Sequence, residues 1–254
     1  MQKPRTIDSK KSQTTLENPQ NLGKQKRLNM NAKRSRSKIP NRFGDTLKGI
    51  ESKIPAIRIN SGILKGFKLE FPFIQQKSKT RPTKAIIRES FFNSIGVQIQ
   101  GVSFIEAFGG SGSMGIEALS HGAKEALFFE SNSKNAQILS HNLARAKVRC
   151  SALQFEVFVQ DFFTSSANLA HLQNKSILYL DPPFFVRAGM EDMYVRCFEF
   201  IAQLENPHIF LCAFEGMSGA EIPQNLGNFV KIKHKKFGKS TISYFLNTQG
   251  ESYG

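Results

Sequence analysis

From about residue 102 onward, short apolar runs alternate with longer segments whose apolar residues recur at helical spacing. Such a short run predicts a buried strand, and apolar residues three and four apart predict an amphipathic helix. Strands are expected at 102–105, 126–129, 155–160, 177–180 and 208–214, and helices at 132–147 and 190–204. This alternation predicts an α/β fold with a mostly parallel sheet, in which ligands bind at the carboxyl ends of the strands.

Before this region, residues 56–59 and 66–71 read as two short strands around a turn and predict a small N-terminal β-hairpin. A helix is then expected to begin at Pro82 or Thr83, because proline suits the first helical turn. Arg81 would lie just outside this helix, and Arg88 one or two turns into it.

Three parts of the chain are expected on this basis. Residues 1–53 are rich in Lys, Arg, Ser, Asn and Gln and predict a disordered basic tail. Residues 54–100 hold the N-terminal hairpin and helix. Residues 101–247 form the main domain, which ends in an antiparallel hairpin of 229–235 and 241–246.

The formal net charge of +15 is concentrated in the tail, where 14 Lys and Arg oppose 4 Asp and Glu, leaving 14 − 4 = +10. Such a balance favours a polyanionic partner, most simply nucleic acid, although a solvated tail that aids solubility is the alternative. The three cysteines form no CxxC pair, which indicates free thiols in a reducing compartment rather than a disulfide or metal framework. The lack of paired cysteines also leads us to expect no bound metal. No apolar run approaches membrane-spanning length, and the N-terminus lacks the apolar core of a secretory signal, so we expect a cytoplasmic protein.

Residues 104–130 carry the most informative pattern: an apolar strand ending in Glu106, a glycine-rich turn, a helix, and a second strand ending in Glu130. This is one half of a nucleotide-binding α/β sheet, in which the second acid can accept hydrogen bonds from ribose hydroxyls. Gly110, Gly112 and Gly115 also satisfy GxGxxG, so a dinucleotide-binding oxidoreductase remains an alternative for this stretch. Glu106 would repel phosphates, however, and suits the cationic S-adenosyl-L-methionine better.

Four acids are expected on one rim of the sheet, because Glu106, Glu130, Asp161 and Asp181 each follow a predicted strand. The last of them opens Asp181-Pro182-Pro183-Phe184. Consecutive prolines hold the turn rigid, so a carboxylate and a carbonyl oxygen can together accept the two hydrogens of an exocyclic amino group. Phe184 offers a ring on which a base can stack.

The chain resembles the RsmD family, bacterial 16S ribosomal RNA guanine-N2 methyltransferases that use S-adenosyl-L-methionine. The segments that carry this resemblance are Arg81-Pro82-Thr83, Arg88-Glu89, Phe91-Phe92-Asn93, Glu106-Ala107-Phe108-Gly109-Gly110-Ser111-Gly112, Phe129-Glu130, Asp161, Asp181-Pro182-Pro183-Phe184 and Phe237-Gly238-Lys239-Ser240-Thr241. The family usually has Asp-Leu-Phe-Ala where this chain has Glu106-Ala107-Phe108-Gly109. The replacement of Asp by Glu keeps the negative charge. The resemblance implies a Rossmann-like class I methyltransferase with a mostly parallel seven-stranded sheet and helices on both faces.

The resemblance also implies roles for individual residues. Glu106 and the loop of Phe108, Gly109, Gly110, Ser111 and Gly112 would hold the methionine part of the cofactor, Glu130 the ribose, and Asp161 with Phe162 would lie near the adenine. Asp181, Pro182, Pro183 and Phe184 would hold the guanine, and Arg81, Thr83 and Arg88 would contact the substrate. The partner would be ribosomal RNA or the small ribosomal subunit, bound by a monomer.

Two other readings of the site remain open. A DNA adenine-N6 methyltransferase shares the Asp-Pro-Pro-aromatic turn, but it commonly carries a separate target-recognition domain for which this chain has little room. An inactive ribosome-associated RNA-binding protein would be expected to have lost Asp181 or Glu130, and both are present.

Overall fold

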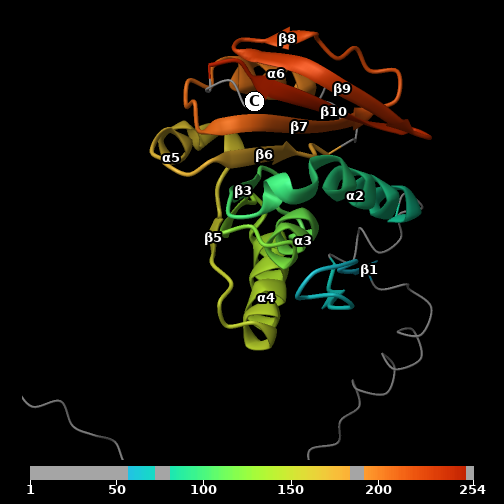
Figure 1. The fold of residues 1–254 in the computed structure, drawn as a ribbon, viewed down its shortest axis with the longest axis vertical. Coiled ribbons are helices and arrows are strands. Elements are labelled where there is room, and N and C mark those ends of the chain that lie inside the picture. Colours follow the sequence, from blue (N-terminus) through green and yellow to red (C-terminus); the bar gives the residue numbers. More distant parts are fainter. Residues whose placement is uncertain (1–56, 72–80, 184–191, 250–254) are drawn as a thin grey trace, which may run out of the picture. The chain divides into compact units, whose positions relative to one another are not determined.

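The structure, a computed structural model, describes residues 57–71, 81–183 and 192–249, which belong to one unit spanning residues 51–254. The tail predicted at 1–53 and the side chains of Arg81 and Phe184 lie outside the described part. Figure 1 shows the arrangement of the described elements.

One sheet of eight strands forms the centre of the fold, in the order β5-β4-β3-β6-β7-β10-β9-β8. The strands are β3 (Ser103–Glu106), β4 (Glu125–Phe129), β5 (Phe155–Phe158), β6 (Ser176–Leu180), β7 (Ile209–Met217), β8 (Asn225–Leu226), β9 (Phe229–Phe237) and β10 (Ser240–Asn247). The strands from β5 to β7 run parallel, and β10, β9 and β8 are antiparallel. The strand beyond the predicted seven is the two-residue β8 at one edge.

Helices cover both faces of the sheet, as expected. The helices are α2 (Arg81–Ile95), α3 (Ser113–Ser120), α4 (Ser133–Arg149), α5 (Ser166–Ala170) and α6 (Met193–Ala202), with 3-10 turns η2 (Gly96–Ile99) and η3 (Phe162–Thr164). Because side chains alternate along a strand, Phe104 packs with α2 and α3, and its neighbour Ile105 packs with α5 and α6. The first helix begins at Arg81 and therefore includes the residue expected just outside it, since Pro82 fits its first turn.

Residues 57–69 form a satellite that packs on α3 and α4 (Figure 1). Only Ile57–Arg58 (β1) and Lys68–Leu69 (β2) pair as antiparallel strands, so the predicted hairpin is present but shorter than its sequence pattern. Between the two strands the chain bends toward α3, and Gly62 adopts φ 75° where a Cβ would lie 1.8 Å from the Ser120 carbonyl oxygen. Glycine is therefore required at this contact.

Candidate active site

The strand order places a ligand site at the carboxyl ends of β3 and β6. From β3 the chain moves outward to β4 and β5, and it then returns to place β6 on the other side of β3. A reversal of this kind opens a crevice beyond the ends of the two central strands. Glu106 is the last residue of β3, and Asp181 directly follows β6, so both predicted acids lie at this crevice.

The glycine loop between β3 and α3 is shaped by contacts within the protein. Gly110 and Gly112 have φ values of 50° and 77°, a left-handed conformation that favours glycine. A Cβ on Gly112 would lie 2.4 Å from Leu139, and one on Gly115 would lie 2.3 Å from Phe128. The space left by these two glycines is thus filled by the protein's own side chains, which lets the loop and α3 pack closely on β4 and α4.

Glu106 lies beneath this loop, with only 5% of its surface exposed. Its carboxylate accepts hydrogen bonds from the backbone N–H groups of Gly115 (2.8 Å) and Met114 (3.4 Å), in the first turn of α3. Burial raises the pKa of Glu106 to about 8, although the two backbone hydrogen bonds favour the ionised form. A carboxyl group with this pKa is mostly protonated near neutral pH, and a cation placed beside it would favour its ionised form. The contact of Glu106 with the methionine end of the cofactor stays a prediction.

Glu130 fastens the glycine loop to the tip of β4. Its Oε2 accepts a hydrogen bond from the Gly110 N–H and its Oε1 one from the Asn132 N–H, both at 2.8 Å. The side chain is only partly buried, and an ionised carboxylate accepts more than two hydrogen bonds. Glu130 can therefore also receive ribose hydroxyls. Residues 106–112 contain no basic side chain, so this rim suits an adenosine ligand with a cationic centre better than one with phosphates.

Asp161 and Phe162 follow β5, at the start of η3, but the ring of Phe162 does not face the crevice. Asp161 accepts a hydrogen bond from the Phe163 N–H (3.1 Å) and pairs with Arg196 (3.2 Å) near the surface. Phe162 is 2% exposed, and its ring packs in the aromatic core, 4.5 Å from the ring of Phe200. Any contact of Phe162 with adenine is thus limited to its backbone.

Asp181 is part of a chain of polar contacts that joins three elements. Lys84 of α2 donates hydrogen bonds to both Asp181 oxygens, at 2.6 and 2.7 Å, and to Oε1 of Glu215 in β7 at 2.6 Å. The hydroxyl of Tyr179 in β6 donates to the other Glu215 oxygen at 2.9 Å. Pro182 is buried and Pro183 exposed. The predicted carboxylate of Asp181 is therefore held by Lys84, which also binds the second acid, Glu215.

Sequence reasoning missed Lys84, Tyr179 and Glu215. Lys84 directly follows Arg81-Pro82-Thr83, and Glu215 directly follows the apolar run 208–214, so it could have been counted as a fifth acid on the rim. Their partnership could not be read from the chain, because 131 positions separate them.

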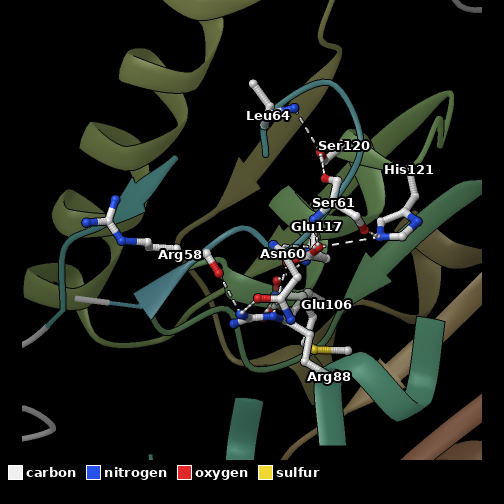
Figure 2. Close-up of polar contacts among 11 residues, drawn as sticks. Arg58, Asn60, Ser61, Leu64, Arg88, Glu106, Glu117, Ser120 and His121 are labelled. Atoms are coloured by element: carbon white, nitrogen blue, oxygen red, sulfur yellow. Dashed lines mark hydrogen bonds and ion pairs between the residues drawn. The ribbon is translucent and has the colours of Figure 1, made fainter. Parts of the chain in front are cut away.

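The substrate contact expected from Arg88 is corrected by the structure. Arg88 is 3% exposed and its Nε pairs with Glu117 Oε2 at 3.1 Å, while its Nη2 donates to the Arg58 carbonyl at 2.7 Å. Figure 2 shows this arginine among buried polar groups that connect α2, α3 and residues 58–61. Its role is therefore structural. Thr83 is half-buried at the start of α2.

The fold and the site together define a class of protein. In this chain a central parallel strand leads into a glycine loop and a helix, acids follow successive strands, and an antiparallel hairpin completes the sheet. This is the arrangement of class I methyltransferases. Residues 57–246 match the family described as Conserved hypothetical protein 95, the RsmD family, and the chain belongs to it. S-adenosyl-L-methionine, the methyl donor of this class, is the cofactor, as predicted.

Individual relatives agree with this assignment. The chain is 34% identical over 144 residues to ribosomal RNA small subunit methyltransferase D of Haemophilus influenzae, a match that covers 56% of this chain and 70% of the relative. It is 28% identical over 201 residues to the Escherichia coli protein of the same name, with coverage of 77% and 93%. A solved methylase structure from Haemophilus influenzae matches with a TM-score of 0.55 and 26% identity, over 76% of this chain and 99% of that chain.

Within 57–71, 81–183 and 192–249, no three His, Cys, Asp or Glu side chains come together as a possible metal site. Over the same ranges, no helix is long and apolar enough to cross a membrane.

Proposed function

We propose that the protein transfers the methyl group of S-adenosyl-L-methionine to the exocyclic N2 amino group of a guanine in small-subunit ribosomal RNA. The observation that carries this proposal is the position of Asp181 and the Pro182-Pro183 turn, beyond β6 and beside the β3 strand that leads into the glycine loop. The substrate class is supported by the relatives, which are named ribosomal RNA small subunit methyltransferase D.

In the proposed reaction, the cofactor supplies an electrophilic methyl group. Glu106 and the loop from Phe108 to Gly112 orient its methionine end, and Glu130 receives its ribose hydroxyls. A guanine amino group is a poor nucleophile because its lone pair is delocalised into the ring. It must therefore be oriented toward the methyl carbon. A negatively charged hydrogen-bond acceptor must also lie beside its nitrogen, to stabilise the positive charge that develops there.

Asp181 is the acceptor in this proposal. Its carboxylate and the backbone carbonyls of the Pro182-Pro183 turn would receive the two amino hydrogens, and they stabilise the amino group more strongly as its charge grows. Asp181 would then take the released proton or pass it to water. Phe184 would stack on the extruded base, and Arg81 and Thr83 would contact the RNA beside it.

The antiparallel end of the sheet offers support for a polyanionic substrate. Strand β9 and the turn after it carry Lys231, Lys233, Lys235, Lys236 and Lys239, and neither β9 nor β10 contains Asp or Glu. The exposed lysines among them, Lys233, Lys236 and Lys239, can neutralise phosphates without reading sequence.

The test is a methylation assay with labelled S-adenosyl-L-methionine and, separately, 16S ribosomal RNA, assembled small subunits and DNA, followed by nucleoside analysis of the product. We expect N2-methylguanosine in RNA or in subunits. Asp181→Asn should lower the single-turnover rate by about two to four orders of magnitude, the range for a positioned acid–base or electrostatic group. Glu156→Gln, at an exposed acid of β5, is the matched control. Label in DNA, in N6-methyladenosine, or at undiminished rate in Asp181→Asn would refute the proposal.

A further inference from the structure

The ammonium group of Lys84 lies between two carboxylates at the candidate active site. It is 2.6 Å from the nearer Asp181 oxygen and 2.6 Å from Glu215 Oε1. The side chains of Lys84 and Asp181 are 29% and 31% exposed, whereas that of Glu215 is 2% exposed. One cation thus bridges a partly exposed acid at the crevice and a buried acid behind it.

The charges of this cluster depend on one another. Burial would lower the pKa of Lys84, but the carboxylates of Asp181 and Glu215 outweigh it and raise this pKa, so the ammonium form is held. Burial and the nearby Asp181 raise the pKa of Glu215 to about 7, and Lys84 and the Tyr179 hydroxyl oppose that rise. Without Lys84, two carboxylates would face each other with no cation between them.

We propose that Lys84 is a positioning residue for methyl transfer, which holds the Asp181 carboxylate in one orientation while Glu215 and Tyr179 hold Lys84. This inference rests on the proposed function, because it assigns Asp181 the amino group. Lys84 contacts both Asp181 oxygens, which fixes the plane of the carboxylate. An ionised carboxylate has about four acceptor positions, so Asp181 can keep this contact and still receive an amino hydrogen.

Other ionisable groups near the cluster sit further along the same network. Tyr194 of α6 interacts electrostatically with Asp181 and Lys84, and its hydroxyl accepts a hydrogen bond from the Met217 N–H at 2.9 Å. Glu106 interacts with Asp181 and Tyr179 from beneath the glycine loop. Among these groups, Lys84 is the cation in direct contact with both Asp181 and Glu215.

The test compares single-turnover methylation across pH for the wild type, Lys84→Met, Lys84→Arg, Glu215→Gln and the double variant Lys84→Met with Glu215→Gln. Lys84→Met should lower the rate at neutral pH at least tenfold and move the acidic limb of the profile to higher pH by about one unit or more, because like charges disfavour ionisation. The KM for S-adenosyl-L-methionine should stay within about twofold. Lys84→Arg should restore most of the rate.

The double variant separates positioning from a general loss of structure. Removing Glu215's charge together with that of Lys84 abolishes the repulsion, so the acidic limb should return toward its wild-type position. Lys124→Met, at an exposed lysine that contacts Asn174 ahead of β4, is the matched control and should change neither rate nor limb. Far-ultraviolet circular dichroism checks that every variant is folded.

The inference would be overturned if the acidic limb of the pH–rate profile stayed at its wild-type pH in Lys84→Met. It would also be overturned if the limb did not move back toward the wild-type pH in the double variant. A faster Lys84→Met enzyme would overturn it too, because Lys84 would then be a latch that the substrate must displace. A titration of the Glu215 carboxyl carbon by NMR tests the electrostatic link without activity: its midpoint should rise in Lys84→Met. If the wild type methylates no RNA, the proposed function fails, and this titration still decides whether Lys84 controls the two acids.

Discussion

Glu117 of α3 joins residues 58–61 to the core, and its replacement should destabilise the fold strongly. Its side chain is 1% exposed and pairs with Arg88 Nε at 3.1 Å. It also accepts hydrogen bonds from the backbone N–H groups of Asn60 (3.0 Å) and Ser61 (3.2 Å), and lies 3.4 Å from His121 Nε2 (Figure 2). One buried carboxylate thus serves two backbone donors and two side chains.

We expect Glu117→Gln to lower the free energy of unfolding by about 3–5 kcal/mol, the cost of removing one partner from a buried ion pair. The amide keeps one oxygen acceptor, but it removes the carboxylate that pairs directly with the buried Arg88 guanidinium. The double variant Glu117→Gln with Arg88→Met leaves no unpaired charge. Its loss should therefore be smaller than the sum of the two single losses by about 1–3 kcal/mol.

Urea unfolding followed by far-ultraviolet circular dichroism measures these differences, with Glu89→Gln on the exposed side of α2 as the control. Amide exchange at Asn60 and Ser61 should accelerate in Glu117→Gln, since both N–H groups lose a charged acceptor. A loss below about 1 kcal/mol, or strictly additive single losses, would refute the reasoning, because Arg88 and Glu117 would then not act as a buried pair.

Two further predictions concern the glycine loop. Gly112→Ala should lower the free energy of unfolding by about 2–4 kcal/mol and weaken cofactor binding, whereas Gly66→Ala should lower it by only about 1–2 kcal/mol. Both residues have positive φ, but only at Gly112 would the added Cβ meet a side chain, that of Leu139. Thermal unfolding and binding calorimetry compare the two variants, and equal losses would contradict this reasoning. Because the pKa of Glu106 is raised to about 8 from 4.5, its contribution to stability is present below about pH 4.5 and is lost as the pH rises to about 8. Glu106→Gln should therefore flatten the decline of stability in this window. Urea unfolding at several pH values tests this, and a difference in unfolding free energy between wild type and variant that does not change with pH would refute it.

The strands were predictable because their apolar runs are short and end at acids or glycines. The sequence also indicated that those acids share one rim, since the carboxyl ends of parallel strands lie at one edge. Strand β7 was predicted to end at residue 214, but it continues to Met217. The strand continues because Glu215, Gly216 and Met217 pair with β10, and Lys84 and Tyr179 satisfy both oxygens of the buried Glu215.

The misassigned role of Arg88 had a signal in the sequence. It lies three and four positions before Phe91 and Phe92, so helical periodicity places it on the apolar face of α2 rather than toward RNA. Lys84 lies a further four positions back, on the same face. What periodicity could not supply is the partner of each cation, because Glu117 and Glu215 come from other elements that only the tertiary fold brings near.

The position of β10 has a consequence for how the protein is made. This strand lies between β7 and β9, although it follows both of them in the chain. During synthesis, β7 and β9 therefore emerge from the ribosome before the strand that joins them, and the sheet cannot close until residue 247 is free. Until then β7, which is buried along nearly all its length in the finished fold, keeps one unpaired edge. A nascent chain arrested shortly before β10 would thus expose an aggregation-prone edge in the interior of its future sheet.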